Sequence, residues 1–327
     1  MNFNSNPVNL SCKLFDVLIR PILTYNSEIW FMDDYFSISR AISRSEQSGS
    51  VCDTLSLEDK FCYEKIHNKF CKYILGLKKI ACNISAKSEL GRFPIIDYIK
   101  TQAILYFCRL QTDPINPLLK EAFSLCKSVD SDGIYTWYSF IGNIFKELDL
   151  EITDFENFTR PFASIKHSLK KKIKKVINDS YSKKTLEKLS SFNETSKLYI
   201  YSKIKSELKL ENYLLFFSNF KMRQLFTKFR VSDHSLEIET GRYKNITREE
   251  RICKNCNLNE IGDEYHFFLK CTANHSLRNN LFNKIILNKP DFIEEIPLNK
   301  INFLLDANSE LLAEVGNIIK QSTELQK

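Results

Sequence analysis

The chain has 327 residues, of which 43% are hydrophobic and 13% aromatic, enough to bury a sizeable core and to exclude a disordered protein. It contains only eight Gly and eight Pro, which disfavours a loop-rich all-β fold and favours long helices. The net charge of +7 points to an acidic partner, and no apolar run approaches the roughly 20 residues of a membrane span.

The N-terminal residues 1–7 are polar and lack the charged-then-apolar plan of a signal peptide. We therefore expect an intracellular protein, in the nucleus, the cytoplasm or both, without a membrane partner. Apolar residues at helical spacing follow, and they predict a helix that Pro21 kinks or ends, because proline removes a backbone donor.

Residues 31–34, Phe-Met-Asp-Asp, match the aromatic-x-Asp-Asp tetrapeptide of reverse transcriptase active sites. In such a site Asp33 and Asp34 bind the metal ions that stabilise phosphoryl transfer. The site also needs an aspartate from a strand well upstream and a hairpin around the tetrapeptide. Here only 30 residues precede Phe31, and the flanking pattern is helical. We interpret Phe31–Asp34 as a solvated helix end or turn and expect no enzyme activity.

The sequence between residues 57 and 110 predicts three helices, and a glycine follows each of the first two. After a Ser-rich stretch, residues 43–56, that we expect to be an exposed loop, apolar residues between 57 and 74 share one helix face, and Gly76 is placed to end it. A short helix over 85–90 is stopped by Gly91, and another runs from 95 to 110. We expect His67, on the first of these helices, to lie at the surface or half buried.

Residues 160–205 concentrate the positive charge, with thirteen basic and three acidic side chains, a net +10. Ile165, Leu169, Ile173 and Val176 recur at helical spacing, which leaves the neighbouring lysines on the other faces of one helix. Such a face is either solvated surface or a phosphate-binding surface, and the metal motif described below favours the second. The candidate nucleic-acid contacts here are Lys170, Lys171, Lys172, Lys174, Lys175, Lys183 and Lys184.

Two features limit this interpretation of the lysine-rich helix. Acidic residues between 147 and 156 precede it and are able to screen it within the chain. Binding to a membrane surface is the rival function, but the apolar face of the helix lacks the Trp and Phe that favour interfacial insertion.

Residues 199–229 interleave aromatic and basic side chains, a mixture that can stack bases and bind phosphates. Because the rings recur at helical spacing, we interpret most of them as core residues. The basic residues that flank the metal motif remain nucleic-acid candidates, and they are Arg223, Lys228, Arg230, Arg242 and Lys244. Residues 240–242, Thr-Gly-Arg, predict a turn.

Four residues near the C-terminus have the spacing C-x2-C-x9-H-x4-C, and they are Cys253, Cys256, His266 and Cys271. Zn²⁺ takes four tetrahedral sulfur and nitrogen ligands, and a Cys3His set leaves no open position. We therefore predict one structural Zn²⁺ that orders a polar segment too poor in apolar residues to fold unaided. Asp263 and Glu264 are expected to orient the second ring nitrogen of the histidine. With ten cysteines in the chain, a chance C-x2-C pair is the alternative.

The metal motif is part of a series of sequence blocks that resemble one protein family. The blocks, in chain order, are Leu14–Pro21 with Glu28–Trp30, Ile66–Gly76 with Ser88–Pro94, Leu225–Arg230, His234–Tyr243, Arg248–Cys256 and Asp263–Cys271. Together they resemble the C-terminal part of LINE-type, non-LTR retrotransposon reverse transcriptases, from the end of the palm through the thumb to the CCHC zinc knuckle. The x9 spacer is longer than the x4 of retroviral nucleocapsid knuckles, so base capture in that style is not expected.

The resemblance implies a region that grips RNA or DNA while chemistry happens elsewhere. We expect a mainly α fold, with a helical thumb-like region over 1–125, a lysine-rich connecting region over 126–205 and a small helical domain with the zinc knuckle over 206–327. The expected partner is RNA, DNA or both, and no small-molecule substrate is expected. A zinc-stapled protein-interaction or structural module is the alternative, as is a remnant with no selected function. The oligomeric state stays open.

Overall fold

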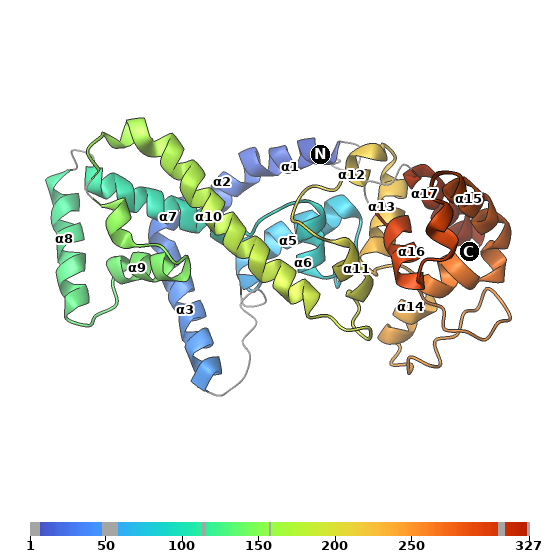
Figure 1. Ribbon diagram of the computed structural model, residues 1–327. Helices are drawn as coiled ribbons and strands as arrows, with labels where there is room; N and C mark the ends of the chain where they lie inside the picture. The colour runs from blue at the N-terminus through green and yellow to red at the C-terminus, as the bar shows by residue number, and fades with distance from the viewer. Residues whose placement is uncertain (1–6, 48–57, 113–115, 157, 307–310, 326–327) are drawn as a thin grey trace. The chain divides into compact units, whose positions relative to one another are not determined.

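The computed structural model describes residues 7–47, 58–112, 116–156, 158–306 and 311–325. Over these residues the protein is mainly α-helical, which confirms the predicted fold class (Figure 1). Extended pairing within the described part of the chain is limited to two isolated antiparallel bridges, between Leu90 and Leu210 and between Ile252 and Ile261. Among the described helices, none combines the length and the apolar character needed to cross a membrane.

The chain forms two compact units, and each is assembled from separate segments. Unit 1 comprises residues 1–13, 69–92 and 185–327, and unit 2 comprises residues 14–68 and 93–184. These boundaries differ from the expected division at 125 and 205. The reason lies in the core of unit 1, where Val8, Cys71 and Leu90 are buried in one cluster with Phe226 and Ile301. Segments far apart in sequence thus share a core, which a division by composition does not detect.

Unit 2 is a set of helices around an aromatic core. Its helix α3 packs on α7 and α9, and α9 also packs on α7 and α8. Phe31 and Tyr35 of α3 each make an edge-to-face ring contact with Phe140 of α9. Its elements are η2 (Phe15–Ile19), α2 (Arg20–Leu23), α3 (Ser27–Gln47), α7 (Ile95–Thr112), α8 (Pro117–Ser131), α9 (Trp137–Glu147) and η3 (Ile152–Phe155), with most of α10 (Phe162–Ser190) and the first half of α5 (Cys62–Leu75).

The Phe-Met-Asp-Asp tetrapeptide lies inside α3 rather than at a solvated helix end. Phe31 has no exposed surface, while Asp33 is exposed and Asp34 accepts a hydrogen bond of 3.2 Å from Tyr63. The aromatic residue is therefore part of the core. Because α3 extends to Gln47, residues 43–47 of the expected loop are helical, and the rest of that loop, with Cys52, lies outside the described residues.

Pro21 lies in the first turn of α2, directly after the π-helical turn η2, and α2 ends two residues later at Leu23. The expectation for His67 was wrong. His67 is fully buried rather than at the surface, stacked on Phe15 with its Nδ1 3.6 Å from the carboxylate of Glu64.

Charged side chains also lie within unit 2. The carboxylate of Glu147 on α9 accepts hydrogen bonds of 2.9 Å from Lys100 and 3.1 Å from Lys184. Burial acts to raise the pKa of Glu147, but the two ammonium groups outweigh it and lower the pKa to about 2. The three side chains thus join α7, α9 and α10.

Unit 1 has a larger hydrophobic core, built mainly by its C-terminal helices. The helices α13 and α17 pack together, α15 contacts α17, and α11 packs on α16. Gly91 ends α6 in the left-handed conformation, with φ +59°, and a Cβ there would lie 2.4 Å from the backbone nitrogen of Leu210. Its elements are α1 (Val8–Leu14, all but its last residue), the second half of α5, α6 (Asn83–Glu89), the end of α10, α11 (Tyr199–Ile204), α12 (Tyr213–Phe216), α13 (Phe220–Arg230), α14 (Glu237–Tyr243), η4 (His266–Lys270), η5 (Thr272–Asn274), α15 (His275–Asn288), η6 (Pro290–Ile293), α16 (Pro297–Leu304) and α17 (Leu312–Leu325).

Candidate metal centre and basic surfaces

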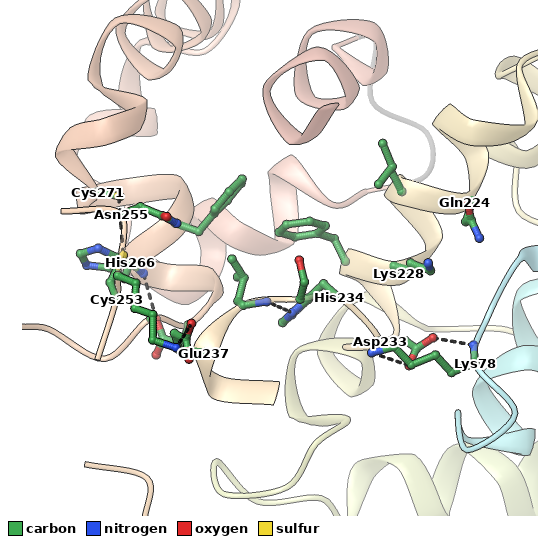
Figure 2. Close-up of a pocket in the computed structure, with 18 of the residues that line it drawn as sticks. Lys78, Gln224, Lys228, Asp233, His234, Glu237, Cys253, Asn255, His266 and Cys271 are labelled. Carbon is green, nitrogen blue, oxygen red and sulfur yellow. Dashed lines mark hydrogen bonds and ion pairs between the residues drawn. The ribbon is translucent and has the colours of Figure 1, made fainter. Parts of the chain in front are cut away.

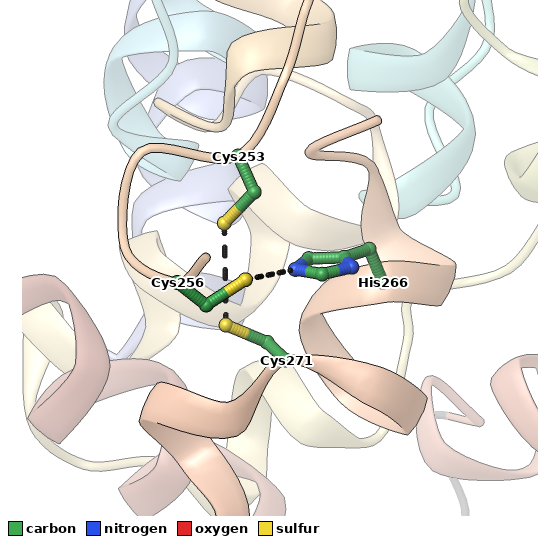
Figure 3. A group of neighbouring side chains, drawn as sticks. All are labelled: Cys253, Cys256, His266 and Cys271. Atoms are coloured by element: carbon green, nitrogen blue, oxygen red, sulfur yellow. Dashed lines mark hydrogen bonds between the residues drawn. The ribbon is translucent and has the colours of Figure 1, made fainter. Parts of the chain in front are cut away.

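The four predicted metal ligands converge at one point in unit 1 (Figure 3). Their ligand atoms all lie within 4.8 Å of one another. Cys253 Sγ and Cys271 Sγ lie 4.0 Å apart, and Cys256 Sγ and His266 Nε2 lie 3.1 Å apart. Cys253, His266 and Cys271 are buried or nearly so, with 9%, 3% and 2% of their surface exposed. Among the described residues, these four are the group of Cys, His, Asp or Glu side chains close enough together to hold one metal ion.

The two cysteines at the start of the motif lie on a tight loop that a short pair of extended segments closes. The backbone N–H of Cys253 donates to the carbonyl of Glu260 at 2.9 Å, and the N–H of Gly262 donates to the carbonyl of Arg251 at 2.8 Å. A Cβ at Gly262 would lie 3.1 Å from the Cα of Cys253, so the close approach of the two segments favours glycine. The guanidinium of Arg251 anchors the base of the loop, donating to the carbonyls of Ile246 and Ile238.

The other two ligands come from the π-helical turn η4. His266 begins this turn and Cys271 follows it, and the N–H of Cys271 donates to the carbonyl of His266 at 2.7 Å. Between them Phe267 and Phe268 point into the core, where both contact the ring of Phe229. The metal ligands are therefore held by residues that belong to the hydrophobic core of unit 1.

The carboxylate that orients the histidine is Glu260, which the sequence argument missed. Its Oε2 lies 3.3 Å from His266 Nδ1, leaving Nε2 to face the cysteines. The expected residues act differently. Asp263 accepts the backbone N–H of His266 at 2.9 Å, and Glu264 is paired with His234 at 2.9 Å. The extended pairing brings Glu260 back toward the histidine, whereas the sequence neighbours Asp263 and Glu264 point elsewhere.

The thiols of the centre differ in acidity. Burial raises the pKa of Cys253 to about 12 and also raises the pKa of Cys271. For Cys256 burial acts in the same direction, but hydrogen bonds from the backbone of Leu258 and from His266 outweigh it and lower the pKa to about 7. Cys256 is thus the thiol most readily converted to the thiolate that binds metals.

Comparison with protein-family models, curated proteins and solved structures found no match to this chain.

The lysines of α10 form an exposed surface in unit 2. Leu169 and Ile173 are buried on one face of this helix, as the sequence predicts, and Ile177 is buried beside them. Ile165 and Val176, which the sequence also placed on this face, are half buried. Lys170, Lys171, Lys172, Lys174, Lys175 and Lys183 are exposed, and Lys184 is half buried. We call Lys170, Lys171, Lys172, Lys174 and Lys175 the α10 lysines.

Two of the acidic residues before α10 are paired with lysines other than the α10 lysines. Glu147 is occupied by Lys100 and Lys184, and Glu156 pairs with Lys127 at 3.0 Å. None of the α10 lysines forms an ion pair with a described residue, and Lys172 lies 5.1 Å over the ring of Phe155. Five ammonium groups within two helical turns are thus presented to solvent.

Two of the arginines expected to contact nucleic acid are buried instead. Arg230 is 1% exposed and makes a two-pronged ion pair with Glu89, with N–O distances of 2.9 and 3.0 Å. Arg223 is 6% exposed and donates to the carbonyls of Phe217 and Ser218. Both belong to the interior of unit 1, and neither is available to a phosphate.

The remaining candidates lie at or near the surface of unit 1. Lys244 is exposed, and Lys228 and Arg242 are half buried. Arg242 donates to Glu239 at 3.3 Å. The predicted turn at 240–242 is instead the end of α14, where Gly241 makes room for the side chain of Arg251.

Proposed function

We propose that the chain is a non-catalytic nucleic-acid-binding module whose unit 1 is organised by one structural Zn²⁺. The observation that carries the proposal is the set of exposed α10 lysines, which form no ion pair with a described residue, in a chain that also holds a Cys3His centre. The partner is RNA or DNA, and binding relies on phosphate contacts rather than on a catalytic site.

The geometry of the centre supports zinc. Zinc–sulfur bonds of about 2.3 Å in a tetrahedral site place two thiolates about 3.8 Å apart, close to the 4.0 Å between Cys253 and Cys271. Three cysteines and one histidine are soft and borderline ligands, which suit Zn²⁺ better than Mg²⁺ or Ca²⁺. The carboxylate of Glu260 on the far side of the His266 ring is a typical outer partner of a zinc-bound histidine.

The metal has a structural role in this proposal. Cys253, Cys256, His266 and Cys271 together supply four ligands and leave no position for a substrate or a reactive water. When bound, Zn²⁺ cross-links the loop over 253–260 to the π-helical turn η4, and η4 is packed into the core of unit 1. A part of the chain that is rich in polar residues is thereby fixed to that core.

The sequence blocks support an origin in the C-terminal region of a LINE-type, non-LTR retrotransposon reverse transcriptase. In this proposal the chain retains the post-palm helices and the zinc knuckle of such a protein, acts in the nucleus or the cytoplasm, and grips RNA or DNA without polymerising it. Phe31–Asp34 then has no catalytic role, in keeping with its place in the core helix α3.

A zinc-stapled protein-interaction module is the second candidate. It is favoured by apolar side chains exposed near the N-terminal end of unit 2, where Val17, Ile22 and Tyr25 are 69%, 74% and 76% exposed. In this case the α10 lysines are ordinary solvated surface, and the protein has no affinity for nucleic acid.

The test is a fluorescence-anisotropy titration of zinc-loaded protein against single-stranded RNA and duplex DNA, with Cys256→Ser as the metal-site variant. The proposal predicts sub-micromolar binding at low salt and one zinc per chain, and a reduced zinc content with weaker binding in the variant. One bound zinc with no nucleic-acid affinity at any salt concentration would refute the proposed function and favour the interaction module.

A further inference from the structure

A hollow of about 640 Å³ opens beside the metal centre in unit 1 (Figure 2). Sites for small molecules and cofactors commonly have volumes of roughly 300–1,000 Å³. One end of the hollow is formed by the metal ligands and the other by α13 and the segment around Lys78. The polar side chains that line it include Lys78, Lys221, Gln224, Lys228, Lys254 and Asn255.

One face of helix α13 supplies a basic wall. Lys221, Gln224, Leu225 and Lys228 follow the spacing i, i+3, i+4 and i+7, which places them on one side of the helix. Gln224 is fixed by a hydrogen bond of 2.7 Å from its Nε2 to the carbonyl of Gly76. The wall is therefore ordered and presents two lysines separated by two helical turns, about 10 Å.

The carboxylates of the hollow already have cationic partners. Asp233 lies 3.9 Å from the ammonium of Lys78 and also accepts the backbone N–H of Lys78 at 2.8 Å. Glu237 pairs with Lys254 at 3.0 Å. The third carboxylate, that of Asp263, lies 3.9 Å from Arg248 and accepts the backbone N–H of His266.

Lys228 is the exception among the charged groups of the hollow. It is half buried, and no carboxylate of a described residue lies within ion-pair distance of its ammonium group. Burial lowers the pKa of Lys228, and the field of Asp233 offsets only part of this effect. An anion in the hollow would stabilise the charged form of the lysine, because it would provide the missing partner.

The other end of the hollow depends on the metal loop. Lys254 and Asn255 lie between the ligands Cys253 and Cys256, so their positions follow from the fold of that loop. A ligand in the hollow would thus contact a wall that metal binding orders and a wall that α13 supplies.

We propose that this hollow binds the phosphomonoester group of a nucleotide, with Lys228 as the cation that contacts the phosphate. A phosphomonoester carries a charge of about −1.5 to −2 near neutral pH and suits lysine, a compact point charge. The volume of the hollow is in the range that accommodates a single nucleotide. The phosphomonoester can belong to the phosphorylated end of a nucleic-acid strand or to a free mononucleotide. For the strand end, the inference rests on the proposed function.

The experiment compares two single-stranded RNA probes that differ only in a 5′-phosphate or a 5′-hydroxyl, each labelled at its 3′ end and titrated with zinc-loaded protein. We expect the 5′-phosphate to improve affinity about tenfold, as a charge-assisted contact would. Lys228→Gln should abolish this difference, while Lys228→Arg should keep most of it. Lys284→Gln, an exposed lysine of α15 outside the hollow, is the matched control and should keep the full difference.

Competition with AMP separates the two sources, because a free mononucleotide that enters the hollow displaces the 5′-phosphate probe but not the 5′-hydroxyl probe. Equal affinity of the wild-type protein for both probes, or a preference that persists in Lys228→Gln, would overturn the inference. If neither probe binds, the proposed function fails, and calorimetric titration with AMP alone tests the hollow. AMP binding that Lys228→Gln abolishes would then support the inference, and no AMP binding would overturn it.

Discussion

Replacing Arg230 with Met removes one partner of a fully buried ion pair while keeping much of the side-chain volume. Arg230 is 1% exposed, and Glu89 has no exposed surface. Without the guanidinium, the Glu89 carboxylate keeps the hydrogen bond of 2.5 Å from Tyr213 and the field of the nearby Lys205 ammonium. The variant therefore leaves a buried charge that is only partly compensated.

The expected loss of stability follows from that geometry. Breaking a buried pair by removing one partner typically costs about 3–5 kcal/mol of unfolding free energy. Because Tyr213 and Lys205 still stabilise Glu89, we expect the lower end, about 3 kcal/mol, for Arg230→Met. The double variant Glu89→Gln with Arg230→Met should be more stable than Arg230→Met alone, since it removes the uncompensated charge.

The assay is urea unfolding of the zinc-loaded protein at pH 7, followed by far-UV circular dichroism. The control is Arg242→Met, which breaks a partly exposed contact with Glu239 and should cost less than about 1 kcal/mol. Equal losses for the two variants would refute the account of Arg230. So would an Arg230→Met protein of wild-type stability with weakened nucleic-acid binding, because that result would place the guanidinium at the surface.

Two further variants test the charged groups at other places. Glu147→Gln removes a carboxyl group whose pKa is 4.5 in the unfolded chain and about 2 in the folded protein. The carboxylate therefore stabilises the fold above about pH 4.5, and this contribution is lost as the pH falls toward 2. We expect the difference in unfolding free energy between pH 7 and pH 3, measured by urea unfolding, to be about 2 kcal/mol smaller in Glu147→Gln than in wild type. An unchanged difference would contradict the ion pairs of Glu147 with Lys100 and Lys184. Glu260→Gln should weaken zinc binding about tenfold in competition with a chromophoric chelator, because the amide orients His266 less strongly than the carboxylate. Glu250→Gln, an exposed acid outside the centre, should not change it, and equal zinc affinities for the two variants would exclude the role of Glu260.

Local patterns in the sequence predicted several features correctly. The helical period placed Leu169 and Ile173 in the core and the lysines outside, because one face of a helix must be buried. Gly76 ends α5 in the left-handed conformation, with φ +66°, as its position after an apolar helix face indicates. The spacing of cysteines and histidine identified the cluster that the structure brings together, because knuckle geometry is local.

Features that depend on distant partners were not predictable in this way. Arg230 resembles any basic residue next to a metal motif, and its burial follows from Glu89, 141 residues earlier in the chain. Glu260 reaches His266 only because two extended segments pair across the metal loop. The hollow beside the centre combines Lys78 with α13 and the metal loop, segments that share no local pattern.

The most direct test of the central claim is the salt dependence of binding to duplex DNA for wild type and for a variant with four α10 lysines, Lys170, Lys171, Lys174 and Lys175, changed to Gln. Each phosphate contact contributes about −0.9 to the slope of log K against log salt concentration. The account predicts a steep slope for wild type and a slope shallower by roughly 3 to 4 for the variant, at unchanged zinc content and stability. Identical slopes for the two proteins would contradict the account, because the α10 lysines would then not contact phosphate.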